Sequence, residues 1–534
     1  MTDRKTKIEP ITHDADRVNI PTPELAPMMD PADAAPIRAA YARRNPDLDP
    51  QLIWRGKDMG ATHVSADAPP IYLQEQVHPK AIIEDLRKGG QRNGEGGGAD
   101  LFDHFGLTDD ATEAEVEFYR HSTRWSNRMI LGDGLQVMAS LAEREGLKGQ
   151  VQAIYIDPPY GIKFNSNFQW STTSRDVKDG NLAHLTREPE QVKAFRDTWR
   201  DGIHSYLQYL RDRLVVAREL LTESGSCFVQ IGDENVHRVR ALMDEVFGED
   251  NFVNLIALKK KGSTLVTESV FDFLVWFAKD REKVKVRKPL VYRKSPEEDN
   301  KFNTLISHEG EMVRTARMQN SDVQDLLEAD WAWARVNYPI VSQHPDEKRS
   351  APFAFHGSLR SCGKNRQWSF DNPEGMQRLS RASRIFDAGG SSLAGVVYHE
   401  DRAAVSLPNL WDDVKGEENA VYVVQTTWKI LQRCLLMTTD PGDLVLDPTC
   451  GSGTTAYVAE QWGRRWITID TSRVALALAR ARIMGAKYPW YLLKDSEEGQ
   501  KNEAEVTRSA PATHATYNDI RHGFVYHRVP HITL

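Results

Sequence analysis

The 534-residue sequence has few cysteines, no long hydrophobic run and no excess of basic residues. Its four cysteines form no CxxC pair, which argues against both a disulfide framework and a zinc ribbon. No segment approaches the roughly 18 uninterrupted apolar residues of a membrane helix, and the charged first ten residues lack the apolar stretch of a signal peptide. We therefore expect a cytoplasmic protein with reduced thiols and no membrane partner.

The balance of charge argues weakly against nucleic-acid binding, because nucleic-acid-binding domains usually carry a basic excess. The chain has 68 Lys and Arg against 76 Asp and Glu, a net charge of -8. Residues 1–120 hold 22 of the acidic and 14 of the basic residues, so the rest of the chain is neutral overall. The acidic excess is therefore a property of the N-terminal part alone.

Short apolar runs alternate with amphipathic segments after residue 120. We expect strands at 129–132, 151–156, 226–231, 253–259, 271–278, 444–447 and 466–470, and helices at 135–145, 192–222, 236–247, 427–438, 454–462 and 473–484. This alternation predicts a parallel α/β sheet with helices on both faces.

The same patterns divide the chain into five parts. Residues 1–120 form an N-terminal extension, with a short helix expected near 34–44 and a Gly-rich linker at 88–100. Loss of the alternation marks an inserted domain. The other parts are a first α/β half at 121–282, the insertion at 283–408, a second α/β half at 409–490 and a C-terminal segment at 491–534. Residues 523–534 have the pattern of a strand that stops abruptly.

Residues 444–456, LVLDPTCGSGTTA, predict a strand, a turn and glycines that open a helix. The GxGxxA spacing meets the dinucleotide fingerprint, and Asp470 is placed to hold ribose hydroxyls, so NAD binding is one interpretation. A glycine turn without a ligand is another. Asp447, however, would repel a pyrophosphate and attract the ammonium and sulfonium of S-adenosylmethionine, whose amino-acid end the N–H groups of the turn can also hold. The candidate cofactor-binding residues are Asp447, Pro448, Thr449, Cys450, Gly451, Ser452, Gly453, Thr454 and Asp470.

A second motif, VQAIYIDPPYG at 151–161, ends an apolar strand at the sheet edge where open α/β sheets bind ligands. Two prolines remove two N–H donors and leave carbonyl acceptors beside Asp157, which suits a substrate NH2 group. If Asp157 and the Pro158 carbonyl accept both protons of an adenine amine, its lone pair can point at the cofactor's methyl group. Tyr160 would stack on a base flipped out of the duplex. The catalytic candidates are Asp157, Pro158, Pro159 and Tyr160; the alternative is a plain Asp-Pro turn.

With both motifs, residues 125–486 resemble the DNA amino-methyltransferases of the N6-adenine group. The motif order, DPPY before the cofactor loop, is similar to that of the circularly permuted beta class, which includes modification subunits of Type III restriction-modification systems. The resemblance implies a Rossmann-like S-adenosylmethionine-dependent methyltransferase sheet, a catalytic half before the insertion and a cofactor-binding half after it. It implies methylation of adenine N6 at a specific sequence of double-stranded DNA. Methylation of N4-cytosine or RNA, and a non-catalytic DNA-binding subunit, are the alternatives; Ser replaces the Asp more often in cytosine-N4 enzymes.

The resemblance also implies further residue roles. Asp133 would lie near the cofactor's adenine, and Phe273 or Phe277 would contact the flipped base. Gln425 begins the segment that closes over the methionine end, although Thr426-Thr427 stands where Lys-Pro is usual. Cys450 is interpreted as a packing residue and not as a nucleophile.

In the class that the sequence resembles, the insertion recognises the DNA sequence, and here it contains two basic stretches, 279–294 and 359–384. Phosphate contact is the functional interpretation of these stretches, and a solvated surface is the alternative. The DNA-binding candidates are Arg360, Lys364, Arg366, Arg378 and Arg381. A restriction subunit and a second copy of the chain are expected partners, since no GxxxxGK[ST] loop occurs here and dimers are common in the class. The C-terminal end resembles an internal strand of longer relatives, as in a truncated version.

Overall fold

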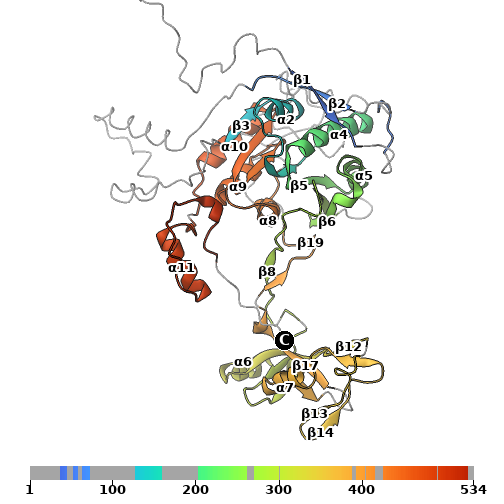
Figure 1. The fold of residues 1–534 in the computed structure, drawn as a ribbon, viewed down its shortest axis with the longest axis vertical. Helices are drawn as coiled ribbons and strands as arrows, with labels where there is room; N and C mark the ends of the chain where they lie inside the picture. The colour runs from blue at the N-terminus through green and yellow to red at the C-terminus, as the bar shows by residue number, and fades with distance from the viewer. Residues whose placement is uncertain are drawn as a thin grey trace, which may run out of the picture. The chain divides into compact units, whose positions relative to one another are not determined.

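A computed structural model of the chain divides it into two compact units (Figure 1). The first comprises Met1–Arg287 and Pro408–Val525, and the second comprises Lys288–Leu407 and the last nine residues. The second unit overlaps the segment 283–408, for which the lost alternation predicts an insertion. The structure describes residues 37–44, 52–57, 63–71, 127–158, 202–260, 270–296, 298–299, 301–344, 346–387, 393–402, 404–414, 425–489 and 491–526.

A mixed sheet of eight strands, in the order β19-β6-β7-β5-β4-β20-β21-β3, forms the centre of the first unit. Its strands are β3 (Arg128–Leu131), β4 (Val151–Ile156), β5 (Leu221–Gly232), β6 (Phe252–Lys259), β7 (Phe271–Ala278), β19 (Leu410–Trp411), β20 (Leu444–Asp447) and β21 (Arg465–Asp470). Every residue of β4 is buried, because helices cover both faces of the sheet. The strand of the DPPY motif thus pairs with the strand of the glycine loop. Circular permutation of the motif order stays a prediction.

The prediction of a parallel sheet is wrong for β7, which runs antiparallel to both of its neighbours, β5 and β6. The remaining pairs of this sheet are parallel. Only eleven residues separate Lys259 from Phe271. A connection this short favours antiparallel pairing of consecutive strands, since a parallel pair requires a crossover of a dozen or more residues.

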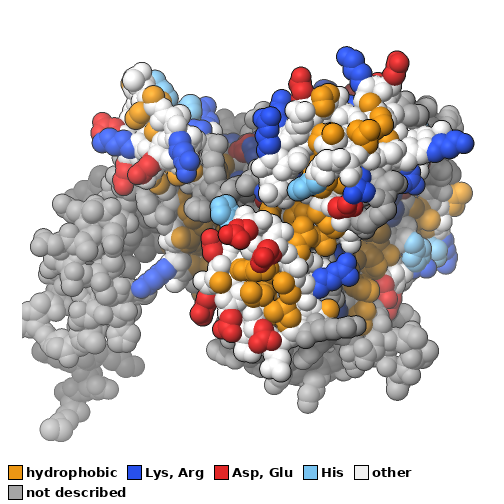
Figure 2. All heavy atoms as spheres, turned by 90° about the horizontal axis from the view of Figure 1, so that it is seen from below, with side chains coloured by type: hydrophobic (Ala, Val, Ile, Leu, Met, Phe, Trp, Pro, Cys, Tyr) orange, Lys and Arg blue, Asp and Glu red, His pale blue; other side chains and the backbone are white. Residues whose placement is uncertain are grey.

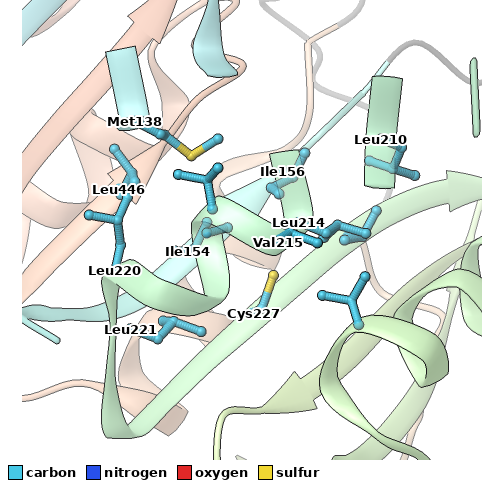
Figure 3. Close-up of a cluster of buried hydrophobic side chains, with 14 of the residues drawn as sticks. Met138, Ile154, Ile156, Leu210, Leu214, Val215, Leu220, Leu221, Cys227 and Leu446 are labelled. Carbon is cyan, nitrogen blue, oxygen red and sulfur yellow. The ribbon is translucent and has the colours of Figure 1, made fainter. Parts of the chain in front are cut away.

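Three helices cover one face of this sheet: α2 (Gly134–Glu143), α4 (Ile203–Leu220) and α5 (Val236–Phe247). Their apolar side chains and those of the sheet form one buried cluster, and Figure 3 shows Met138, Ile154 and Leu214 among its members. The helices α8 (Trp428–Thr438), α9 (Thr454–Gln461) and α10 (Arg473–Met484) pack on the other face. Burial of this apolar surface stabilises the sheet by roughly 25 cal/mol per Å².

The helix expected near 34–44 is absent; its described residues belong to β1 (Ile37–Ala42), which pairs antiparallel with β2 (His63–Ala68). The two strands bury every second residue, including Tyr41 and Val64, in the same cluster as α2 and α4. Burial on one face of a strand pair outweighs the helix propensity of this Ala-rich segment. The described part of the N-terminal extension is therefore integral to the first unit.

The second unit contains a five-stranded sheet of order β10-β9-β11-β17-β16 and three two-stranded ribbons, all antiparallel. Trp368 is fully buried in its larger apolar cluster, and its indole N–H donates to the Ala351 carbonyl at 3.0 Å. The elements are β8 (Leu290–Tyr292), β9 (Thr304–Ile306), β10 (Met312–Arg314), α6 (Asn320–Glu328), β11 (Ala332–Tyr338), β12 (Val341–Gln343), β13 (Phe353–Phe355), β14 (Ser358–Arg360), β15 (Arg366–Trp368), α7 (Glu374–Arg381), β16 (Ile385–Asp387), β17 (Leu393–Tyr398) and β18 (Ala404–Ser406).

The C-terminal segment contains α11 (Glu497–Thr507) and a single β-bridge between Leu493 and Phe524. The strand expected at 523–534 is therefore reduced to one bridge as far as residue 526, and the rest lies outside the described residues. No helix in the described ranges is both long and apolar enough to span a membrane.

Candidate active site

Three carboxylates lie at one edge of the central sheet. Asp447 and Asp470 are the last residues of β20 and β21, and Asp157 directly follows β4. These three strands are parallel neighbours, so their carboxyl ends meet at the same edge. The sequence predicted the three acids separately, and the structure brings them together where α/β sheets bind ligands.

Thr449 joins the DPPY strand to the glycine loop. Its hydroxyl accepts the backbone N–H of Asp157 at 2.8 Å and donates to Oδ1 of Asp447 at 3.1 Å. The Thr449 N–H donates to the same Asp447 oxygen at 2.9 Å. The Asp157 carboxylate is held separately, because Oδ2 accepts the Thr426 hydroxyl at 2.8 Å. Both the backbone and the side chain of Asp157 are thus fixed.

The glycine loop is held by Asp470 and by a close approach of two helices. Gly451 donates its N–H to Oδ2 of Asp470 at 2.8 Å, and Oδ1 accepts the N–H of Ser472, also at 2.8 Å. Gly453 has a left-handed φ of 72°, and a Cβ there would lie 2.7 Å from the Cβ of Ala479. Glycine at 453 is therefore required both by the turn and by the packing of α9 on α10.

Burial raises the pKa of all three carboxyls: Asp157 to about 7, and Asp447 and Asp470 to about 6 each. Hydrogen bonds from Thr426 and Thr449 oppose the increase, whereas the Asp447 charge adds to it at the other two sites. Among the described residues no Lys, Arg or His forms an ion pair with any of the three. Within the described part of the chain the negative charge of the site is therefore uncompensated, which favours a cationic ligand.

Within the described ranges, no three His, Cys, Asp or Glu side chains are grouped so as to hold a metal ion. Cys450 is buried, and burial raises the pKa of its thiol well above the ordinary value. A thiol that stays protonated is a poor nucleophile. The carboxylates are thus the groups of this loop that can act on a ligand.

A family model described as DNA methylase (N6_N4_Mtase) matches residues 151–481, which include all three carboxylates. The chain belongs to the DNA methylase family.

Two curated proteins resemble this methylase over most of its length. The Type II methyltransferase M.EcaI of Enterobacter cloacae is 23% identical over 73% of this chain and 75% of its own. The probable Type III restriction-modification enzyme HindVI Mod subunit of Haemophilus influenzae is 27% identical over 70% of this chain and 53% of its own. The match thus spans about half of the Type III relative.

Solved structures of DNA methyltransferases are similar to the chain more distantly. The PvuII DNA methyltransferase (cytosine-N4-specific) is 15% identical, with a TM-score of 0.31, and the match covers 68% of this chain and 87% of that one. The M1.HpyAVI–SAM complex is 12% identical with a TM-score of 0.29, covering 66% and 98% of the two chains. Likenesses this weak identify no activity.

Asp133 of the methylase lies at the start of α2, beside the glycine loop. Its Oδ1 accepts the N–H groups of Leu135 and Gln136 at 2.9 and 3.3 Å, and Oδ2 accepts Arg213. Asp133 is therefore the N-cap of α2, a role that stabilises the helix by about 1 kcal/mol. A Cβ on Gly134 would lie 3.1 Å from the Pro448 carbonyl, so this segment adjoins the loop as a cofactor-binding role requires.

Sequence reasoning missed two residues of this site. Thr426, which follows the predicted Gln425, stands out in the sequence only as a departure from Lys-Pro, yet its hydroxyl donates to the Asp157 carboxylate. Arg482 on α10 donates to the hydroxyls of Thr454 and Ser452 at 2.8 and 3.2 Å and thereby fixes the loop. No local pattern distinguishes Arg482 from other helix-surface arginines, because its partners lie about 30 residues away.

The structure describes only one of the remaining DPPY residues. Pro158 is buried beside Asp157, whereas Pro159 and Tyr160 lie outside the described residues, so their roles stay predictions.

Of the two base-contact candidates, Phe277 does not fit, because its side chain is fully buried and packs against Phe247 and Phe252. Phe273 is only half-buried and pairs with Ile231 near the carboxyl end of β5, so it stays the candidate.

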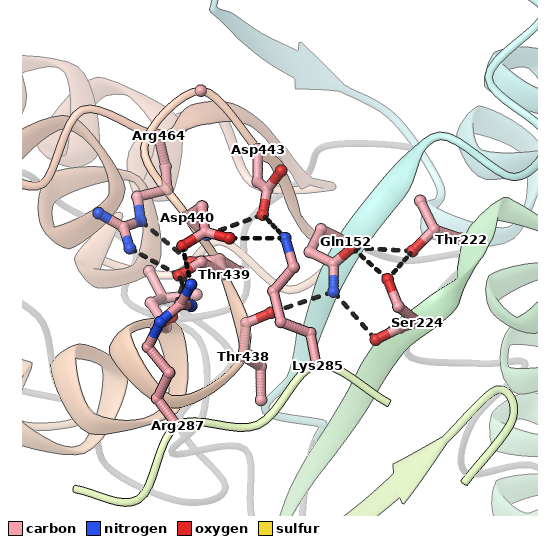
Figure 4. A network of polar contacts seen from close by, with 12 residues as sticks. Gln152, Thr222, Ser224, Lys285, Arg287, Thr438, Thr439, Asp440, Asp443 and Arg464 are labelled. Carbon is pink, nitrogen blue, oxygen red and sulfur yellow. Dashed lines mark hydrogen bonds and ion pairs between the residues drawn. The ribbon is translucent and has the colours of Figure 1, made fainter. Parts of the chain in front are cut away.

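The basic stretch at 279–294 is partly neutralised by carboxylates of the first unit. Lys285 pairs with Asp440 at 2.9 Å and with Asp443 at 2.7 Å, and Arg287 pairs with Asp440 (Figure 4). Lys279 pairs with Glu223 at 3.2 Å. Phosphate contact by this part of the stretch stays a prediction, and these side chains would first have to leave their carboxylate partners.

The candidates at 359–384 lie in the second unit. Lys364 and Arg366 are exposed, as are Arg378 and Arg381 on α7, whereas Arg360 pairs with Asp387. In the view of Figure 2, Lys and Arg side chains are interspersed with Asp and Glu and form no continuous basic band. Phosphate contacts by the four exposed residues stay a prediction, and Arg360 would first have to leave its carboxylate partner.

Proposed function

We propose that the chain transfers a methyl group from S-adenosylmethionine to N6 of a flipped-out adenine in a specific sequence of double-stranded DNA. The observation that carries this proposal is the convergence of Asp157, Asp447 and Asp470 at one sheet edge without a cationic partner among the described residues. A buried carboxylate is costly unless a positive group compensates it. The cofactor would supply that positive charge.

The residues present fit S-adenosylmethionine, which supplies a methyl group made electrophilic by a sulfonium. Asp447 is only 4% exposed and would hold the ammonium of the cofactor. Asp470 would accept the ribose hydroxyls, since two backbone N–H groups leave part of its lone-pair capacity unused. A pyrophosphate cofactor such as NAD is disfavoured, because three carboxylates would repel it.

The substrate amine would be bound by Asp157 and the Pro158 carbonyl. An exocyclic amine is a weak nucleophile, because its lone pair is delocalised into the ring. Two acceptors for its protons draw the nitrogen toward sp3 geometry, and the lone pair then points at the methyl carbon. Transfer of the methyl group would leave the nitrogen positive, and the Asp157 carboxylate would stabilise that charge and accept the proton that the nitrogen releases.

Adenine is favoured over cytosine by the residue that begins the motif. The chain has Asp157 where cytosine-N4 enzymes more often have Ser. Incubation with radiolabelled S-adenosylmethionine and unmethylated genomic DNA, followed by nucleoside analysis, should give N6-methyladenine. Label in N4-methylcytosine, or only in RNA or protein, would contradict the adenine assignment. The Asp157→Ala variant is the matched control and should give far less labelled nucleoside under the same conditions.

We propose that the second unit binds the DNA backbone through α7. Replacing both Arg378 and Arg381 with Ala should reduce the slope of log K against log salt by about 2, because each phosphate contact releases about one counterion. The measurement is a filter-binding titration over roughly 50–300 mM salt, a range in which such slopes can be resolved. Arg314→Ala, an exposed arginine of the same unit outside the stretch 359–384, is the control. An unchanged slope in the double variant would exclude α7 from the interface.

We also propose that a separate restriction subunit and a second copy of the chain are partners. The support for the restriction subunit is that several similar proteins are named as Mod subunits of Type III restriction-modification enzymes, whereas the second copy rests on the resemblance alone. Both assemblies stay predictions.

A further inference from the structure

We infer that Thr426 is a positioning residue: its hydroxyl holds one carboxylate oxygen of Asp157, so that the other oxygen faces the substrate amine. This inference rests on the proposed function and deepens it, because it assigns a role to a residue outside both motifs. Thr426 lies just before α8 and does not belong to the DPPY strand or to the glycine loop. It therefore acts on Asp157 from a third segment of the chain.

A line of hydrogen bonds runs from the sheet interior to Asp157. Tyr155 donates its hydroxyl to Oε1 of Gln230, and Nε2 of Gln230 donates to the Thr426 hydroxyl at 3.3 Å. The Thr426 hydroxyl in turn donates to Oδ2 of Asp157 at 2.8 Å. Thr454 at the start of α9 donates to the Thr426 carbonyl at 3.4 Å. Thr426 is thus held at its side chain and its backbone.

The chemistry of these groups sets the direction of the last bond. A threonine hydroxyl has one hydrogen to donate and two lone pairs that accept. The Gln230 nitrogen can only donate, so it occupies a lone pair of Thr426 and leaves the hydroxyl hydrogen for Asp157. No described residue donates to Oδ1 of Asp157. Oδ1 is therefore the oxygen available to the amine.

The groups behind Thr426 belong to rigid elements. Tyr155 and Gln230 lie on the adjacent parallel strands β4 and β5, with 2% and 6% of their surfaces exposed. Side chains on packed strands hold a geometry better than side chains on loops. Asp157 would otherwise be free to rotate, because it follows the end of its strand.

The Thr426 bond also favours the ionised form of Asp157. The groups that face this carboxyl from neighbouring elements are Asp447 on β20, Asp272 on β7 and Tyr206 on α4. Asp447 and Asp272 favour protonation, and Lys260 partly compensates the charge of Asp272 through an ion pair of 2.5 Å. Thr426 supplies the largest opposing effect on the Asp157 pKa, so its loss should raise that pKa.

The test is the pH profile of kcat/KM for Thr426→Val, an isosteric change that removes the hydroxyl, and Thr426→Ser, which keeps it. The natural protein should lose activity as pH falls through about 7, because the carboxylate must be ionised to accept amine protons. Thr426→Val should shift the midpoint to higher pH and lower the plateau by about 10-fold, as expected for a lost hydrogen bond to a charged group. Thr426→Ser should restore both. Thr427→Val is the matched control and should keep the midpoint of the natural protein.

The outcomes separate this inference from the proposed function. No methylation of DNA by the natural protein would mean that the proposed function fails, whatever Thr426 does. An active protein whose midpoint is unchanged in Thr426→Val would overturn the positioning role. Tyr155→Phe provides a second measurement, with a smaller upward shift expected. Cofactor affinity should stay within about twofold in every variant, since a merely structural defect would reduce it as well.

Discussion

Replacing Asp157 with alanine should lower the rate of methyl transfer by about 10³-fold while leaving cofactor affinity nearly unchanged. Removing one preorganised group that stabilises developing charge typically costs 10²- to 10³-fold in rate. Here the acceptor for the amine proton is lost as well. The link from this position to the glycine loop is unaffected, because Thr449 accepts the backbone N–H of residue 157 and not the side chain.

Single-turnover methylation of unmethylated DNA, with cofactor affinity measured by calorimetry, checks both halves of this prediction. Asp157→Asn is the matched variant, since it keeps the shape and removes the charge. Its single carboxamide oxygen would be taken by the Thr426 hydroxyl, so we expect nearly the same loss of rate. Residual activity above a tenth of the natural rate, or loss of cofactor binding in both variants, would refute the division of roles between Asp157 and Asp447.

The folding stability of these variants distinguishes a catalytic defect from an unfolded protein. The pKa of Asp157 is raised in the folded protein, so its ionisation opposes folding. This penalty is absent well below the unfolded pKa, grows as pH rises toward about 7, and is complete above it. At pH 8 the Ala and Asn variants should therefore unfold at an equal or higher denaturant concentration than the natural protein. Such an increase in stability is expected where a buried charge destabilises the fold but is required for function.

The sequence predicts the elements around the site well where the pattern is local. The bounds expected for β4, α5, β7 and α10 are those of the structure, because each apolar run ends at a residue that breaks its pattern, such as Gly248 after α5. The direction of β7 could not be predicted in this way. Orientation depends on which strands become neighbours, and β7 lies between β5 and β6 although it follows both in the chain.

The acids of the site could be predicted, but the groups that hold them could not. An acid at the end of an apolar strand is visible as a motif, as at Asp157 and Asp447. Thr426 lies 269 residues from its partner Asp157, and Lys285 lies 158 residues from Asp443. A count of local charge therefore predicts a basic surface at Lys285, whereas in the folded chain distant carboxylates neutralise the charge of this side chain. Asp133 is an intermediate case, since an Asp just before a helix is a recognisable N-cap signal.

Replacing Asp447 with asparagine should weaken the binding of S-adenosylmethionine by about 100-fold. Asparagine keeps an oxygen for the N–H and hydroxyl of Thr449, so the loop should retain its fold. The lost interaction is that of a buried carboxylate with the cofactor's ammonium. A hydrogen bond between charged groups contributes about 1.5–3 kcal/mol, which corresponds to roughly 10- to 150-fold in affinity.

Comparing the affinities of two ligands shows whether Asp447 contacts the ammonium or the sulfonium of the cofactor. S-adenosylhomocysteine keeps the ammonium but lacks the sulfonium, so equal losses for both ligands are expected if the carboxylate holds the ammonium. A loss confined to S-adenosylmethionine would place the sulfonium beside Asp447 instead. Asp413→Asn is the control, because this carboxylate pairs with Arg433 on the surface and should leave both affinities unchanged. Unchanged affinity in Asp447→Asn would remove the loop carboxylate from the cofactor site and leave Asp470 as its main acidic ligand, since the Asp470 oxygens lie at the neighbouring strand end.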